Sequence, residues 1–178
     1  MSSAHAQTRQ TGPVENTEWR LRPPANLVSR RAILHWTLRA AVGWVIVVGA
    51  QAIHLLVNTD SPTWVRIAAL VSLVVAVAHV AVMPRWRYAV HRWETNPDAV
   101  YTRSGWINQE WRLAPVSRIQ TVDTARGPLQ QVLDLATVTV TTASAAGPVK
   151  IENLDASVAA RLADELTSTT KATPGDAT

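Results

Sequence analysis

Few side chains in this sequence could do covalent or acid–base chemistry. The chain has 178 residues with no cysteine and five histidines, so neither a disulfide nor a thiolate metal site can form. One histidine, His91, follows residue 83 and could be drawn into a triad with Asp98 or Asp123 and a serine. No nucleophile-elbow motif supports that triad. We therefore expect His91 to be a surface residue on a strand.

Metal and cofactor sites also lack their usual spacings. The sequence has no His-x-x-x-His, Asp-x-Asp or Glu-x-x-His pair. Gly105 and Gly127 each stand apart from other glycines, which excludes a glycine-rich phosphate-binding loop. We therefore predict that the protein is not an enzyme and that it has no catalytic residue, metal or cofactor.

Two apolar stretches determine the class of the protein. No Lys, Arg, Asp or Glu occurs in residues 40–57 or in residues 67–83. Uncharged runs of about 18 or more residues are typical of membrane spans, and Trp64 and Trp86 can extend the shorter run into the interfaces. The break between the runs contains Asp60 and Pro62. The pattern predicts a transmembrane helical hairpin over residues 33–83, with spans at 33–57 and 65–83.

The net charge of +4 is unevenly distributed. Five arginines and two glutamates occupy the first 34 residues, whereas ten bases and ten acids balance after residue 83. The positive-inside rule then places both termini in the cytoplasm of a cell-membrane protein. A nucleic-acid-binding domain is usually strongly basic, so the neutral C-terminal region argues against that partner.

Three histidines, His35, His54 and His79, lie in or near the spans. Ionisable residues inside a membrane are candidates for function. Alternatively, each could sit in an interface as a neutral imidazole. His35 and His79 fall at similar depth near the cytoplasmic end, where they could meet.

After residue 83 the pattern changes to short strands. Alternation predicts a first strand over residues 86–91, and Ser104-Gly105 predicts a tight turn between strands 99–103 and 106–113. Further strands are expected at 119–124, 135–142 and 148–152. A helix capped by Asp155 follows, with one apolar face. Its apolar positions are Val158, Ala159, Leu162, Ala163 and Leu166. Strands followed by one helix indicate a small antiparallel sandwich or barrel that the helix closes.

The expected organisation has five parts. Residues 1–18 form a disordered N-terminus, 19–32 a juxtamembrane segment and 33–83 the hairpin. Residues 84–169 form the cytoplasmic domain, and residues 170–178 form a disordered tail. The sequence is already small and polar from Thr167, so we expect loose structure from that residue onward.

Several motifs together resemble the bacterial PH-like membrane proteins of the YdbS type. The matching pieces are Trp19-Arg20-Leu21-Arg22-Pro23-Pro24, Arg87-Tyr88, Gly105, Pro115-x-x-Arg118-Ile119-Gln120-Thr121-Val122, Gly127-Pro128-Leu129, Leu135-Ala136-Thr137-Val138 and Thr141-Thr142-Ala143. Asp134 stands where the family usually has glycine. The resemblance implies a PH-like fold of two nearly orthogonal sheets closed by a C-terminal helix. It also implies a hetero-complex with a longer paralogue that carries several such domains.

Six residues are candidates for a partner or lipid surface. Arg118 and Gln120 lie in the most family-like run, although Gln120 could instead satisfy a neighbouring backbone group. Trp106 lies at a hairpin tip, where a partner or lipid headgroups could meet it. Arg85, Arg87 and Arg112 could form a local basic face toward anionic lipid.

The sequence thus predicts an α+β membrane protein whose PH-like domain assembles with itself or with a larger PH-domain membrane protein, in envelope function. One alternative is an anionic-lipid-recognising membrane module. Another is an accessory subunit of a transporter or enzyme complex.

Overall fold

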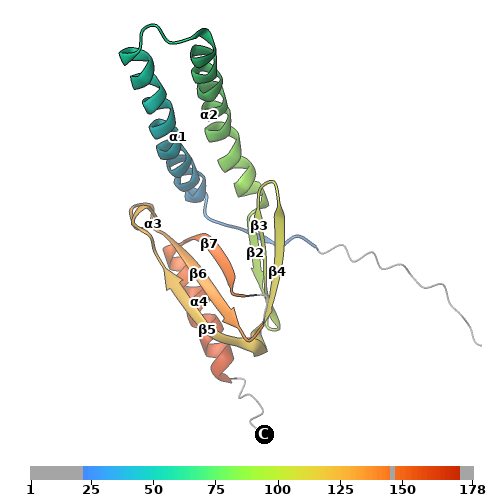
Figure 1. Ribbon diagram of the computed structural model, residues 1–178. Helices are drawn as coiled ribbons and strands as arrows, with labels where there is room; N and C mark the ends of the chain where they lie inside the picture. The colour runs from blue at the N-terminus through green and yellow to red at the C-terminus, as the bar shows by residue number, and fades with distance from the viewer. Residues whose placement is uncertain (1–21, 145–146, 173–178) are drawn as a thin grey trace, which may run out of the picture.

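The computed structural model describes residues 22–144 and 147–172, which form a helical hairpin and a β-rich domain (Figure 1). The elements in chain order are β1 (Asn26–Leu27), α1 (Arg31–Val57), α2 (Thr63–Val90), β2 (Arg92–Thr95), β3 (Ala99–Gly105), β4 (Gln109–Pro115), the 3₁₀ turn η1 (Val116–Arg118), β5 (Ile119–Ala125), α3 (Pro128–Val132), β6 (Leu135–Thr142), β7 (Val149–Asp155) and α4 (Ala156–Ala172). The predicted N-terminal segment 1–18 and the residues from Trp19 to Leu21 lie outside the described residues.

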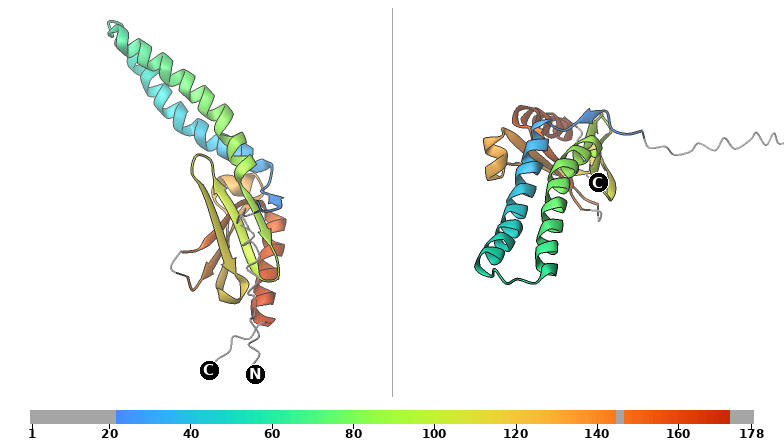
Figure 2. Two further views of the ribbon diagram at one scale, coloured as in Figure 1. Left: turned by 90° about the vertical axis from the view of Figure 1, so that its right-hand side faces the viewer. Right: turned by 90° about the horizontal axis from the view of Figure 1, so that it is seen from above.

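α1 and α2 run antiparallel, side by side, and project from one end of the domain (Figures 1 and 2). Both helices are long and apolar enough to cross a membrane. At about 1.5 Å per residue, each exceeds the roughly 30 Å hydrocarbon core. Two side-chain hydrogen bonds join them, from Gln51 Nε2 to Ser72 Oγ (3.0 Å) and from Trp44 Nε1 to His79 Nδ1 (3.1 Å). The predicted spans 33–57 and 65–83 fall within these two helices.

α2 continues through Pro84 to Val90, so the predicted strand over residues 86–91 was wrong. Alternation over so few residues is also compatible with a helix. The buried or half-buried positions here have the three- and four-residue spacings of one helical face. They are Met83, Pro84, Arg87, Tyr88, Val90 and His91. The first strand after the hairpin, β2, therefore begins at Arg92, one residue beyond the end of α2.

The domain has two antiparallel sheets, ordered β1-β2-β3-β4 and β5-β6-β7. β1 was not predicted; it brings the segment before the hairpin onto the sheet, with Asn26 opposite Trp93. The β3–β4 turn also differs, because β3 continues to Gly105 and pairs it with Gln109. Gly105 has φ 108°, and a Cβ there would collide with the Asn108 carbonyl, so glycine is required.

The second sheet follows the sequence more closely. β6 occupies the predicted residues 135–142, and β5 extends the predicted strand by one residue to Ala125. The short helix α3 was not predicted. Asp134, which replaces the usual glycine, keeps a left-handed backbone with φ 55° and forms ion pairs with Arg126 (3.1 Å) and Arg31 (3.4 Å).

α4 lies along the second sheet and closes the core (Figure 1). Ala159, Leu162 and Leu166 are buried, Val158 is half-buried and Arg161 is exposed, which confirms the predicted face. The helix continues to Ala172, so the prediction of loose structure was wrong for residues 167–172. Residues 173–178 lie outside the described residues.

Leu162→Ala should destabilise the domain by about 2–5 kcal/mol, because it removes a buried side chain from the core. A small domain has only about 5–15 kcal/mol of stability, so limited proteolysis of the detergent-solubilised protein should cut the variant domain faster. Arg161→Ala, on the exposed side of α4, is the matched control. Equal protease sensitivity of the two variants would contradict the packing of α4 described above.

Candidate interaction surface

Four side chains connect the membrane helices to the domain; we call them the junction cluster (Trp36, Arg87, His91 and Glu152). The Arg87 guanidinium lies 4.7 Å from the centroid of the Trp36 ring. Its Nη2 is 3.2 Å from Glu152 Oε2 on β7. The ring centroids of Trp36 and His91 are 4.9 Å apart. One arginine near the end of α2 thus contacts both α1 and the edge strand of the second sheet.

His91 is 4 % exposed, so the prediction of a surface histidine was wrong. It lies one residue beyond α2 and faces α1, not solvent. Its Nδ1 donates to the Arg87 carbonyl (2.9 Å), and Arg87 Nε lies 3.5 Å from its Nε2. Burial lowers the pKa of the imidazole below about 6.5, and the Arg87 charge lowers it further, while the bond to the Arg87 carbonyl and Glu152 act in the opposite direction.

A polar pocket of about 540 Å³ opens beside the junction cluster, between β3–β4 and β7. It brings together two predicted residues, Arg87 and Arg112, and adds Lys150. Two acids also line it: Glu152 pairs with Arg87, and Glu110 pairs with Arg112 (2.6 Å). The two glutamates offset two of the three basic side chains, so the pocket has only a small excess of positive charge.

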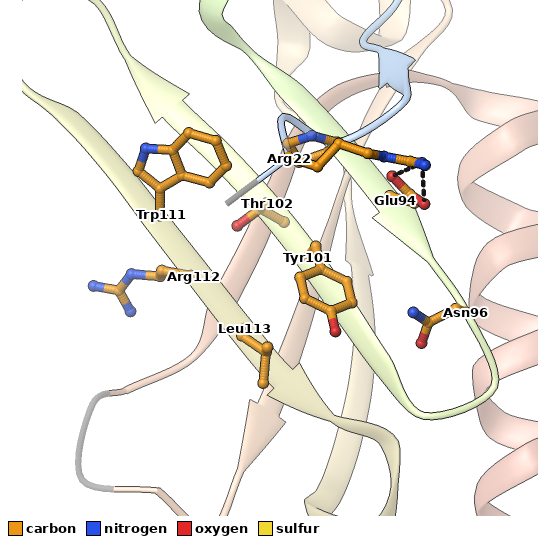
Figure 3. Close-up of a pocket in the computed structure, with 9 residues that line it drawn as sticks. Arg22, Glu94, Asn96, Tyr101, Thr102, Trp111, Arg112 and Leu113 are labelled. Carbon is orange, nitrogen blue, oxygen red and sulfur yellow. Dashed lines mark hydrogen bonds and ion pairs between the residues drawn. The ribbon is translucent and has the colours of Figure 1, made fainter. Parts of the chain in front are cut away.

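An apolar groove of about 320 Å³ crosses the outer face of β2–β4; we call it the outer groove (Figure 3). Trp111 and Leu113 are 38 % and 52 % exposed, and Tyr101 lies beside them on β3. Arg22 and Glu94 close one side through an ion pair of 3.0 Å. These residues were not predicted to form a site, although the alternation of Trp111, Arg112 and Leu113 is typical of a strand with an outward apolar row.

Trp106 is half-buried at the tip of the β3–β4 hairpin, where its ring centroid lies 5.8 Å from that of His79 on α2. His79 also accepts the hydrogen bond from Trp44. Among the described residues, the ring of His79 therefore contacts the rings of Trp44 and Trp106. The contact between His79 and His35 that the sequence suggested is not formed.

The remaining predicted residues lie elsewhere. Arg85 is exposed on α2 and donates to the Ala81 carbonyl (2.7 Å). Arg118 and Gln120 are exposed in η1 and β5, at the end of the domain away from the helices (Figure 1). The six predicted residues therefore do not form one surface. Ile119 between them is buried in the core.

Comparison with known proteins finds a family and one similar protein. A sequence profile of the family "Bacterial PH domain" matches residues 38–170. The UPF0699 transmembrane protein YdbS of Bacillus subtilis (strain 168) is 28% identical over 158 residues, which cover 86% of this chain and 97% of that protein. No solved structure matches the chain significantly.

Stability should fall as the pH decreases from 7.5 to 5. Because the pKa of His91 is lower in the folded protein, the unfolded chain binds a proton at this imidazole more readily. The stability that the neutral His91 contributes is therefore present above about pH 6.5 and is lost as the pH falls from there through the pKa of the folded state. Thermal unfolding in detergent, followed by tryptophan fluorescence, should show a shallower pH dependence for His91→Gln. His54→Gln, at the far end of α1, should retain the wild-type slope; equal slopes for both variants would contradict the assignment.

Proposed function

We propose that this chain, which belongs to the bacterial PH domain family, is a non-enzymatic protein that crosses the membrane twice and assembles through its PH-like domain. Its partner is a second copy or a larger paralogous membrane protein with PH-like domains, and the complex acts in the cell envelope. The outer groove is the observation that carries the proposal.

The composition of the outer groove supports a protein partner. Trp, Tyr and Arg are the residue types that contribute most to binding at interfaces. Here Trp111 and Tyr101 line one groove beside the exposed Leu113, and Arg22 closes one side of it. The Arg103 guanidinium lies 5.0 Å from the Trp111 ring centroid, which places a charge at the border of the apolar surface. An apolar centre with a polar border is typical of association surfaces.

Membrane geometry limits how two copies could meet. β4 is an edge strand whose start lies near α2 and whose end lies at the far end of the domain (Figure 1). Antiparallel pairing of two β4 edges would place the near end of one strand beside the far end of the other. The two hairpins would then point in opposite directions. We therefore infer lateral contact through the outer groove, which lets both copies share one membrane.

Charge supports an arrangement with both termini in the cytoplasm. Arg30, Arg31 and Arg39 lie at the same end of the hairpin as Arg85 and Arg87. The opposite loop carries Asp60, with Arg66 on the first turn of α2. Arginines concentrate on the cytoplasmic side of membrane proteins, so the domain is assigned to that side.

Recognition of anionic lipid by charge is less well supported. Arg87 and Arg112 line the polar pocket, but each is paired with a glutamate. Binding a lipid phosphate there would require these pairs to open.

Purification in a gentle detergent should yield an oligomer or a complex with a larger PH-domain membrane protein, as measured by native mass spectrometry. Leu113→Asp should weaken association about tenfold or more, since it places a charge in the apolar groove; tenfold corresponds to about 1.4 kcal/mol. Val132→Asp is the matched control, because Val132 is 82 % exposed on α3, away from the groove. A monomeric, partner-free protein at native expression would refute the proposal, as would equal effects of both variants.

Single cysteines can test the topology cleanly, because the natural chain has none. Thr59→Cys, between the helices, should react with a membrane-impermeant thiol reagent in intact cells. Ser144→Cys, in the domain, should react only with a permeant reagent or after lysis. Reaction of the Ser144→Cys protein with the impermeant reagent would overturn the cytoplasmic assignment.

A further inference from the structure

We propose that the tip of the β3–β4 hairpin, residues 105–108, is inserted into the inner leaflet of the membrane that holds α1 and α2, with Ile107 in contact with lipid. The inference rests on the proposed insertion of both helices. It adds a third membrane contact, made by the domain itself. The hairpin tip reaches the level of the domain-proximal end of α2 in both side views (Figures 1 and 2).

The depth of the tip follows from its contact with α2. The Trp106 ring meets the His79 ring edge-on, with centroids 5.8 Å apart. His79 precedes Arg85 by six residues, or about 9 Å along a helix. Arg85 is the first charge after the apolar run 67–83 and therefore marks the headgroup level. Trp106 consequently lies deeper in the leaflet than Arg85.

α1 gives the same depth independently. Trp44 follows Arg39 by five residues, or about 7.5 Å, and its Nε1 donates to His79 Nδ1 (3.1 Å). The centroids of these two rings are 6.2 Å apart. Three aromatic rings from α1, α2 and the hairpin tip thus share one level. Tryptophan rings favour the boundary between headgroups and acyl chains, where this level falls.

The tip itself has the chemistry of a lipid contact. Residues 104–108 carry no charge, and Ile107 is 72 % exposed. The nearest charged residue on β3, Arg103, is directed to Gln109 Oε1 (2.6 Å) and the Trp111 ring. The left-handed backbone at Gly105 fixes the turn, so the tip presents Ile107 in a defined position. Such an exposed apolar side chain is stabilised when acyl chains replace water around it.

Spin labels on single cysteines in lipid nanodiscs, with one protein copy per disc, can test the insertion. The three labelled positions are Ile107→Cys at the tip, Val74→Cys on the exposed side of α2, and Asp98→Cys in the turn at the opposite end of β3. Labels in lipid collide more with oxygen, and labels in water collide more with a water-soluble nickel chelate. We expect the Ile107 and Val74 labels to favour oxygen and the Asp98 label to favour nickel.

The outcomes separate this inference from the proposed function. An Ile107 label that favours nickel, with the Val74 label in lipid, overturns the insertion and leaves the spanning hairpin intact. A Val74 label in water overturns the spanning hairpin itself. An Ile107 label shielded from both reagents contradicts lipid contact, because it indicates burial against protein. Adding Trp106→Ala should shift the Ile107 label toward nickel, because the contact that holds the tip against His79 is lost.

Discussion

The interaction between Arg87 and Glu152 is the constraint on which the rest of the structure depends. It joins the end of a membrane helix to the edge strand of the second sheet, and Trp36 on α1 covers the guanidinium. A half-buried charge beside a membrane needs such a partner, since leaving it unpaired is costly. Ser29, just before α1, adds a backbone bond to the Asn153 carbonyl (3.1 Å) and a side-chain bond to Asp155 (2.7 Å). Both membrane helices are thereby held on β7.

The lack of a linker makes this connection mechanically important. α2 ends at Val90, β2 begins at Arg92, and the single residue between them, His91, is buried in the junction cluster. The domain consequently has a fixed orientation relative to the hairpin. That orientation carries the β3–β4 tip to His79 and directs the outer groove sideways. A flexible linker would have left both surfaces without a defined position relative to the membrane.

The sequence predicted the elements whose pattern is local. The uncharged runs identified the hairpin, and the β-branched run 135–142 and the apolar face of α4 were confirmed. It failed where a residue's environment is set by a distant segment. His91 is buried because Trp36 and Arg87 cover it, and β1 exists because β2 offers it a free edge. Arg118 and Gln120 shared a motif with the core residue Ile119, but their own side chains face solvent far from the helices.

Ion pairing bears on the two contacts that we propose for the domain, one with lipid and one with a protein partner. The arginines of the polar pocket are paired with Glu110 and Glu152, so electrostatic attraction to anionic headgroups is reduced at the position where a basic lipid site would be expected. The lipid contact that we propose instead uses the uncharged hairpin tip at Ile107. The outer groove lies on a different part of the same sheet, on the outward side of β2–β4. The proposed lipid contact at the tip would therefore leave the groove open for the lateral assembly that we propose.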